Sequence, residues 1–123
     1  MPAEYRIDRS KRLILSRAWG VMTDQDLVAN RTALFADPGF APDLDQLYDL
    51  SEVTEVKVSS TVLLHLAMSS RFSPLSRRAV VVTSDVAFGM ARMYAMLTGH
   101  EDTIQVFRDR ADAVRWLEAP RGP

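Results

Sequence analysis

The stretch that decides the fold is Arg78-Ala79-Val80-Val81-Val82-Thr83-Ser84-Asp85. Its centre, residues 79–83, is a continuous apolar and β-branched run, which is typical of a strand covered on both faces of a sheet. Ser84 or Asp85 then stands where the N-cap of a helix belongs. The stretch therefore predicts an interior strand that leads directly into a helix, with further helices packed above and below the strand.

Downstream of this stretch the sequence predicts a helix, a strand and a final helix. The first of these helices ends at Gly99, because glycine is the usual residue just past a helix C-terminus. Residues 104–107 predict the last strand, and Asp109 with Asp112 caps the final helix. The first helix carries an apolar stripe at helical spacing, formed by Val86, Met90, Ala91, Tyr94 and Leu97.

Upstream, residues 5–8 and 13–19 predict an opening β-hairpin that stops before Gly20. Thr23, followed by Asp26, predicts the N-cap of a helix that ends at residues 37–39. Residues 46–50 predict a short strand, which is followed by a polar connection through Glu52, Thr54 and Glu55. Ser59 or Ser60 can cap a second helix. The predicted order is ββαβαβαβα, an α/β fold with a mixed sheet of about five strands and four helices, in one domain spanning residues 1–123.

Composition excludes several classes of protein. The chain of 123 residues is 47% hydrophobic and 25% charged, and it has no run of roughly eighteen apolar residues that would cross a membrane. Without a secretory signal at its start, we expect a cytoplasmic protein. The absence of cysteine excludes disulfides and thiolate chemistry, and the net charge of −1 argues against a nucleic-acid partner.

Arg71, Arg77 and Arg78 gather before the central strand, where we expect a solvated loop in preference to an anion site.

The chain resembles the SpoIIAA-like family, which shares the STAS fold of anti-sigma-factor antagonists and is compared with the CRAL-TRIO lipid-binding fold. The resemblance spans nearly the whole chain and is carried by core and cap residues. These are Trp19-Gly20 with Thr23 and Asp26, the stretch 78–85 leading into Gly89-Met90-Ala91-Arg92, and Val106-Phe107-Arg108-Asp109 with Ala113, Trp116 and Leu117.

The resemblance implies a module that binds protein partners, nucleotides or lipids. In true antagonists a serine at the start of the helix after the third strand is phosphorylated, and here Ser59 and Ser60 occupy that region. The aspartate before these serines and the glycine after them are missing. We therefore favour an N-cap role over a phosphorylation switch, although a phosphate there would meet the positive end of a helix.

Residues that could carry catalysis are few. A nucleophile elbow, a phosphate-binding glycine loop and a metal-ligand cluster are all absent from the sequence, so we expect no metal, no cofactor and no catalytic residue. A hydrolase would depend on Ser59 or Ser60, His65 and Asp49 converging in space. Asp85 opens the third helix at a strand end where α/β sheets tend to bind ligands, but a capping role explains it as well.

Met90, Met93 and Met96 recur at three-residue intervals on the third predicted helix. Methionine suits a pliable pocket or a partner-facing groove, and we expect Met93 or Met96 to be exposed. The leading hypothesis is a non-catalytic STAS-like module that binds a protein partner, or a second copy of itself, through this helix. The alternative is a carrier of a small apolar ligand or lipid, with a cavity lined by Met68, Phe72, Met90 and Tyr94. A Ser/His hydrolase comes third.

Overall fold

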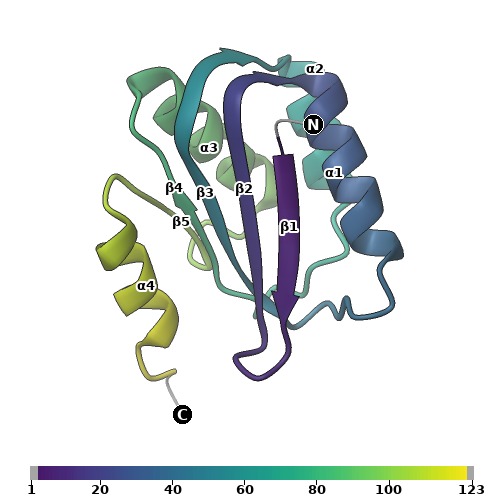
Figure 1. Ribbon diagram of the computed structural model, residues 1–123, viewed down its shortest axis with the longest axis vertical. Helices are drawn as coiled ribbons and strands as arrows, with labels where there is room; N and C mark the ends of the chain where they lie inside the picture. The colour runs from purple at the N-terminus through teal and green to yellow at the C-terminus, as the bar shows by residue number, and fades with distance from the viewer. Residues whose placement is uncertain (1–2, 122–123) are drawn as a thin grey trace.

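A five-stranded sheet forms the frame of the protein in the computed structural model, which describes residues 3–121. Its strands lie side by side in the order in which they occur along the chain (Figure 1). They are β1 (Ala3–Asp8), β2 (Leu13–Thr23), β3 (Asp45–Lys57), β4 (Arg78–Val81) and β5 (Ile104–Phe107). β1 pairs antiparallel with β2, and every later pair is parallel. The predicted element order and the mixed sheet are confirmed.

Four helices cover the two faces of this sheet. They are α1 (Asp24–Ala36), α2 (Ser60–Met68), α3 (Asp85–Thr98) and α4 (Arg110–Glu118). The first three connect parallel strands and share one face, because side chains from all of them meet Tyr48 and Leu50 of β3 around one cavity. The alternate residue Leu47 packs instead against Ala113 of α4. α4 therefore lies on the opposite face, and Figure 1 shows it well separated from α1.

The valine run is buried as the sequence predicts, with side chains that alternate between the two covered faces, although the strand ends at Val81 and not at the predicted residue 83. Val81 packs toward α4 with Leu47, whereas Val82 packs with Ala87 of α3. Both valines are almost fully buried.

The predicted stripe on α3 is partly wrong, since Val86 and Leu97 are exposed and the buried positions are alanines, namely Ala87, Ala91 and Ala95. Small residues let the helix approach the sheet closely.

Helix termini form where the sequence places them. The side chains of Thr23, Ser59, Ser84 and Asp109 each accept a hydrogen bond from a backbone N–H in the first turn of their helix. This contact satisfies a donor that would otherwise lack a partner. Gly99 ends α3 with φ of 74°, a left-handed conformation that glycine adopts without steric cost.

β1 begins two residues earlier than the sequence predicts, and β2 and β3 are extended much further at their C-terminal ends. β2 continues past Gly20 to Thr23, and the polar connection expected after Leu50 is the second half of β3. The two extensions pair with each other in parallel, with register shifts on either side of Gly20, whose φ is 68°. Glycine therefore does not end the strand but accommodates an irregularity in the ladder.

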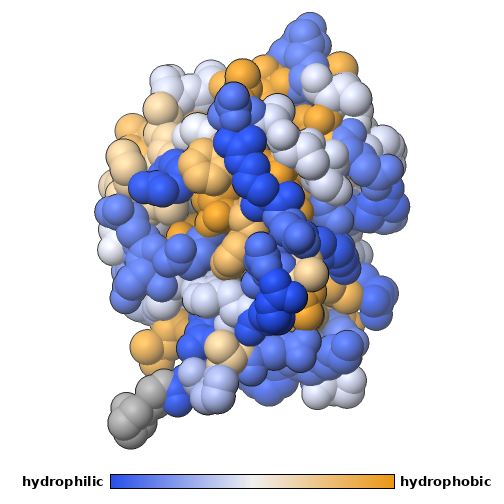
Figure 2. Space-filling model, turned by 90° about the vertical axis from the view of Figure 1, so that its left-hand side faces the viewer, coloured by the Kyte–Doolittle hydropathy of each residue, from blue (hydrophilic) through white to orange (hydrophobic). Residues whose placement is uncertain are grey.

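Apolar and polar surface is unevenly distributed. The side of the molecule on which α4 lies in Figure 1 faces the viewer in Figure 2, where hydrophilic residues cover most of the surface and separate smaller apolar areas. Larger exposed apolar side chains occur on α2 and α3. Within residues 3–121 no helix is long and apolar enough to span a membrane.

Candidate functional site

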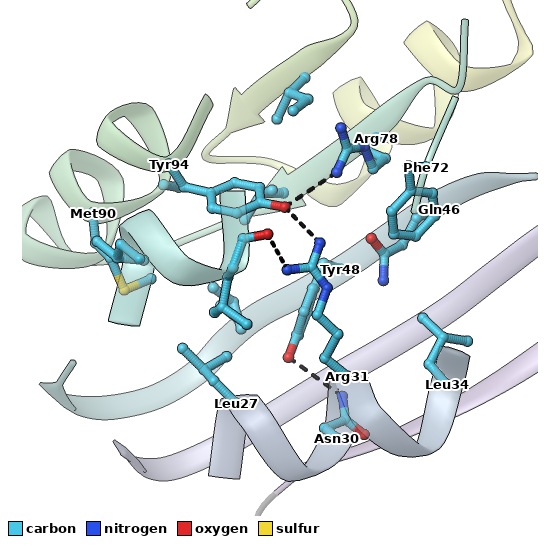
Figure 3. Close-up of a pocket in the computed structure, with 16 residues that line it drawn as sticks. Leu27, Asn30, Arg31, Leu34, Gln46, Tyr48, Phe72, Arg78, Met90 and Tyr94 are labelled. Atoms are coloured by element: carbon cyan, nitrogen blue, oxygen red, sulfur yellow. Dashed lines mark hydrogen bonds between the residues drawn. The ribbon is translucent and has the colours of Figure 1, made fainter. Parts of the chain in front are cut away.

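A cavity of about 110 Å³ lies between the sheet and the helices α1, α2 and α3 (Figure 3). Its wall is mainly apolar, and a few polar groups converge on it, which is the usual composition of a small-molecule site. The lining residues are Leu27, Asn30, Arg31, Leu34, Gln46, Tyr48, Leu50, Leu63, Leu66, Phe72, Arg78, Val80, Met90, Ala91, Tyr94 and Ile104.

Regular backbone geometry positions these side chains. On α1 the lining residues Leu27, Arg31 and Leu34 are spaced by four and three positions, so they share one face of the helix. On the strands the lining residues alternate, and Arg78 of β4 lies directly beside Gln46 of β3 in the parallel register. Apart from Phe72, which lies in the connection between α2 and β4, the cavity is built from helices and strands, which makes its geometry precise.

Two arginines and a tyrosine form the polar centre of the cavity. The hydroxyl oxygen of Tyr94 accepts one hydrogen bond from Nη2 of Arg31 at 2.9 Å and a second from Nη1 of Arg78 at 3.3 Å (Figure 3). Arg31 also donates through Nη1 to the carbonyl oxygen of Leu66. These bonds join α1, α2, α3 and β4 at a single point.

Arg78 is the most unusual residue of the cavity. It is only 3% exposed, and its guanidinium lies 4.6 Å from the centre of the Phe72 ring. Its Nε is buried and has no hydrogen-bond partner among residues 3–121. Burial lowers the pKa of Arg78, the interactions with the Tyr94 hydroxyl partly oppose this, and the positive charge of Arg31 adds a smaller lowering effect. The prediction that Arg78 belongs to a solvated loop is wrong.

No negative charge balances these arginines. None of the lining side chains is acidic, and within residues 3–121 neither Arg31 nor Arg78 forms an ion pair. Other arginines of the chain do find carboxylates, for example Arg110 with Asp49 at 2.9 Å. The cavity is thus apolar in its walls and cationic at its centre.

Neutral polar groups complete the lining. Asn30 donates to the hydroxyl of Tyr48 at 3.5 Å, and Gln46 donates to Ser16 at 3.0 Å. Burial raises the pKa of the Tyr48 hydroxyl, so this group is neutral at physiological pH. Asn30 and Gln46 are themselves buried, and their hydrogen bonds hold their side chains in place.

Three of the four residues predicted to line a cavity do so, namely Phe72, Met90 and Tyr94. The fourth, Met68, is 78% exposed at the end of α2 and lies outside the cavity, which corrects that part of the prediction. Met93 and Met96 are exposed on α3, as expected for at least one of them. Arg31, Asn30 and Gln46 are not predicted as site residues from the sequence, and for Arg78 a solvated loop is preferred to an anion site.

The residues required for a Ser/His hydrolase do not come together. Asp49 follows Tyr48 in β3 and points to the α4 face, where it binds Arg110. Burial alone would raise the pKa of Asp49, but hydrogen bonds from Ser51 and Arg110 outweigh it and hold this pKa below its ordinary value. His65 is exposed on α2, on the other side of the sheet from Asp49. A triad of these residues is excluded by the sheet between them.

Asp85 is an exposed residue in the first turn of α3 and does not itself cap the helix. Ser84 provides the cap, and Asp85 pairs with Arg108 at 2.7 Å. Asp85 does not line the cavity. Its expected capping role therefore belongs to the neighbouring serine, and the carboxylate acts in an exposed ion pair that contributes little to stability.

Ser59 and Ser60 differ in their structural roles. Ser59 is the N-cap of α2, and its Oγ accepts the backbone N–H of Val62 at 3.2 Å. Ser59→Ala is therefore expected to lower the free energy of unfolding by about 1 kcal/mol, because this N–H loses its partner. Ser60→Ala, the matched control, should change it by less than about 0.5 kcal/mol. Urea denaturation of both variants checks this, and equal effects would contradict the assignment of the cap.

Comparison with known proteins supports the fold. The arrangement of sheet, helices and cavity places the chain among the α/β domains with a mixed sheet. It is similar to the crystal structure of an uncharacterized protein of the DUF3478 family with a SpoIIAA-like fold from Shewanella loihica PV-4. The TM-score is 0.61 at 20% sequence identity, and the match covers 94% of this chain and 93% of that one. No protein-family model and no curated protein matches the chain. The chain therefore has a SpoIIAA-like fold.

Proposed function

We propose that the protein is a non-catalytic module that binds a small, mainly apolar ligand in the cavity between its sheet and α1, α2 and α3. The observation that carries this proposal is the cavity itself, whose walls are formed by aliphatic and aromatic side chains from three helices, three strands and the connection between α2 and β4. The cavity thus favours a carrier of a small apolar ligand over a module that binds a protein partner through α3.

The volume of the cavity limits the ligand. An engineered cavity of roughly 150 Å³ with apolar walls holds benzene. The cavity of about 110 Å³ is of the same order, so it accommodates a ligand, or the end of a longer one, of about six to eight non-hydrogen atoms. A six-carbon chain with one polar end group is a suitable probe of this size.

Ala91→Leu is expected to weaken the binding of six-carbon ligands at least about tenfold, because Ala91 lines the cavity and the larger side chain fills it. NMR titration of the protein with hexanamide and with hexanoate measures this affinity. In the wild type, the resonances of cavity-lining residues should shift with at least one of the two ligands.

Ala29→Leu is the matched control, since Ala29 is exposed on α1 and the same side chain is added at the surface. It should bind as the wild type does. If neither ligand perturbs the lining residues of the wild-type protein, the proposed function is wrong.

Exposed apolar side chains favour a second candidate function, the docking of a protein partner or a second copy of the chain. Leu64 and Met68 of α2 and Met93 and Met96 of α3 are all more than 40% exposed. Such side chains mark an interaction site when they are contiguous. Partner binding stays a prediction, and it is compatible with a ligand in the cavity because Met93 and Met96 do not line it.

A further inference from the structure

We propose that the ligand is an amphipathic carboxylate, whose carboxylate group is bound by Nη2 of Arg78 and by the hydroxyl of Tyr94. This inference rests on the proposed function and adds the chemical class of the ligand. Its basis is the juxtaposition of an apolar cavity with two cationic side chains that have no anionic partner.

The two arginines of the cavity carry positive charge that no acidic side chain of the described residues balances. Removing a cation from water is unfavourable unless an opposite charge and hydrogen bonds compensate for it. Arg78 is 3% exposed, Arg31 lies near enough to share Tyr94 with it, and neither is paired with an acid in the described part of the chain. The protein alone therefore leaves the charge of this site uncompensated. A bound anion supplies what is missing.

The hydrogen-bond donors of Arg78 show where the anion binds. Nη1 is occupied by Tyr94, whereas Nε is buried without a partner and no bond from Nη2 occurs among residues 3–121. The N–H groups of Nε and Nη2 lie on one edge of the guanidinium and form two parallel bonds with the two oxygens of a carboxylate. Nε is enclosed by protein atoms, so Nη2 is the donor that a carboxylate in the cavity contacts directly, and Nε lies beside it on the same edge.

Tyr94 contributes a third donor. Its oxygen accepts bonds from Arg31 and Arg78, which leaves its own O–H available to donate a hydrogen bond. Among residues 3–121 this O–H donates no hydrogen bond, and the residue lines the cavity. The Phe72 ring, stacked at 4.6 Å, holds the guanidinium plane of Arg78 in place before the ligand arrives. The donors are therefore preorganised for a planar anion.

The remaining wall of the cavity favours a carboxylate over a phosphate. Beyond the polar centre the lining is formed by leucine, valine, methionine and phenylalanine side chains. A dianionic phosphate would bring a larger charge and more acceptors than these walls can satisfy. A carboxylate with a short aliphatic or aromatic tail matches both parts of the cavity.

The test compares three ligands with the same six-carbon chain, namely hexanoate, hexanamide and hexyl phosphate, by NMR titration at pH 7. Hexanoate and hexanamide have nearly the same shape, so their ratio of affinities reports the charge of the carboxylate. We expect the wild-type protein to bind hexanoate about ten to one hundred times more tightly than hexanamide, as for hydrogen bonds to a charged group. Hexyl phosphate should bind more weakly than hexanoate.

Arg78→Met should abolish the preference, so that hexanoate binds no more tightly than hexanamide. Arg71→Met is the matched control, because Arg71 is exposed, donates to the carbonyl oxygen of Phe35 and does not line the cavity. It should retain the wild-type ratio. The wild-type ratio is itself decisive and does not depend on the folding of any variant.

The outcomes separate this inference from the proposed function. If the wild type binds hexanamide as tightly as hexanoate, the cavity binds apolar ligands but the carboxylate assignment is overturned. Tighter binding of hexyl phosphate than of hexanoate would also overturn the assignment. Retention of the preference in Arg78→Met would show that another group recognises the carboxylate, and it would overturn the role of Arg78.

Discussion

Leu47→Ala is expected to lower the free energy of unfolding by about 2–5 kcal/mol, the range for removal of a fully buried leucine side chain. Leu47 is 2% exposed and packs with Ala79 and Val81 of β4 and Ala113 of α4. These neighbours belong to rigid strands and a helix, so they cannot collapse into the space that the leucine vacates. Urea denaturation monitored by circular dichroism measures the change.

Leu75→Ala provides the control, because Leu75 is 77% exposed and its removal leaves no cavity. A change within about 0.5 kcal/mol is expected for it. If Leu47→Ala had an equally small effect, α4 would not be packed on the sheet in solution, and the description of β3 as a strand covered on both faces would be wrong.

The parts of the fold that the sequence predicts well are those with a local chemical cause. A helix N-cap needs a short polar side chain beside the first turn. Thr23 and Asp109 each accept a hydrogen bond from a backbone N–H only two or three residues further along the chain. Gly99 ends α3 for an equally local reason, its positive φ. The apolar run at Val81 is buried on both faces because no polar residue interrupts it.

The length of β3 could not be predicted from the same signals. Its second half contains Glu52, Thr54 and Glu55, which are exposed polar residues and are typical of a connection. They are held in a strand because β2 extends beside them, and because Val53 between them is buried. The pairing is a tertiary cause that a local sequence window does not contain.

The polar centre of the cavity was missed for a related reason. Arginine is rarely buried without a partner, so its presence before a strand is normally a sign of a solvated loop. Period-two alternation would have placed Arg78 on the same face as the partly buried Val80 and the buried Val82. Arg31 likewise falls between Leu27 and Leu34 on one face of α1. Such interruptions of an apolar face by a cation are the signal that identifies this site.

An arginine buried without an acid is expected to reduce the stability of the empty protein, and its removal tests this directly. Arg78→Met should raise the free energy of unfolding of the ligand-free protein by about 1–3 kcal/mol, since the penalty of the unpaired Nε disappears. Methionine replaces the aliphatic stem of the arginine and retains contact with Phe72. Tyr94 keeps its bond to Arg31 at 2.9 Å, so no new unpaired group is created.

Arg71→Met is again the control, because Arg71 is exposed. Its free energy of unfolding should change by at most about 0.5 kcal/mol. Both variants are measured by urea denaturation without ligand. Destabilisation by Arg78→Met would mean that the stacking on Phe72 and the bond to Tyr94 outweigh the cost of burying the charge. Stabilisation combined with loss of hexanoate binding would have one physical explanation. The fold would then retain an unfavourable buried cation because the proposed ligand pairs with it, and the stability lost in the empty state would be recovered as binding free energy.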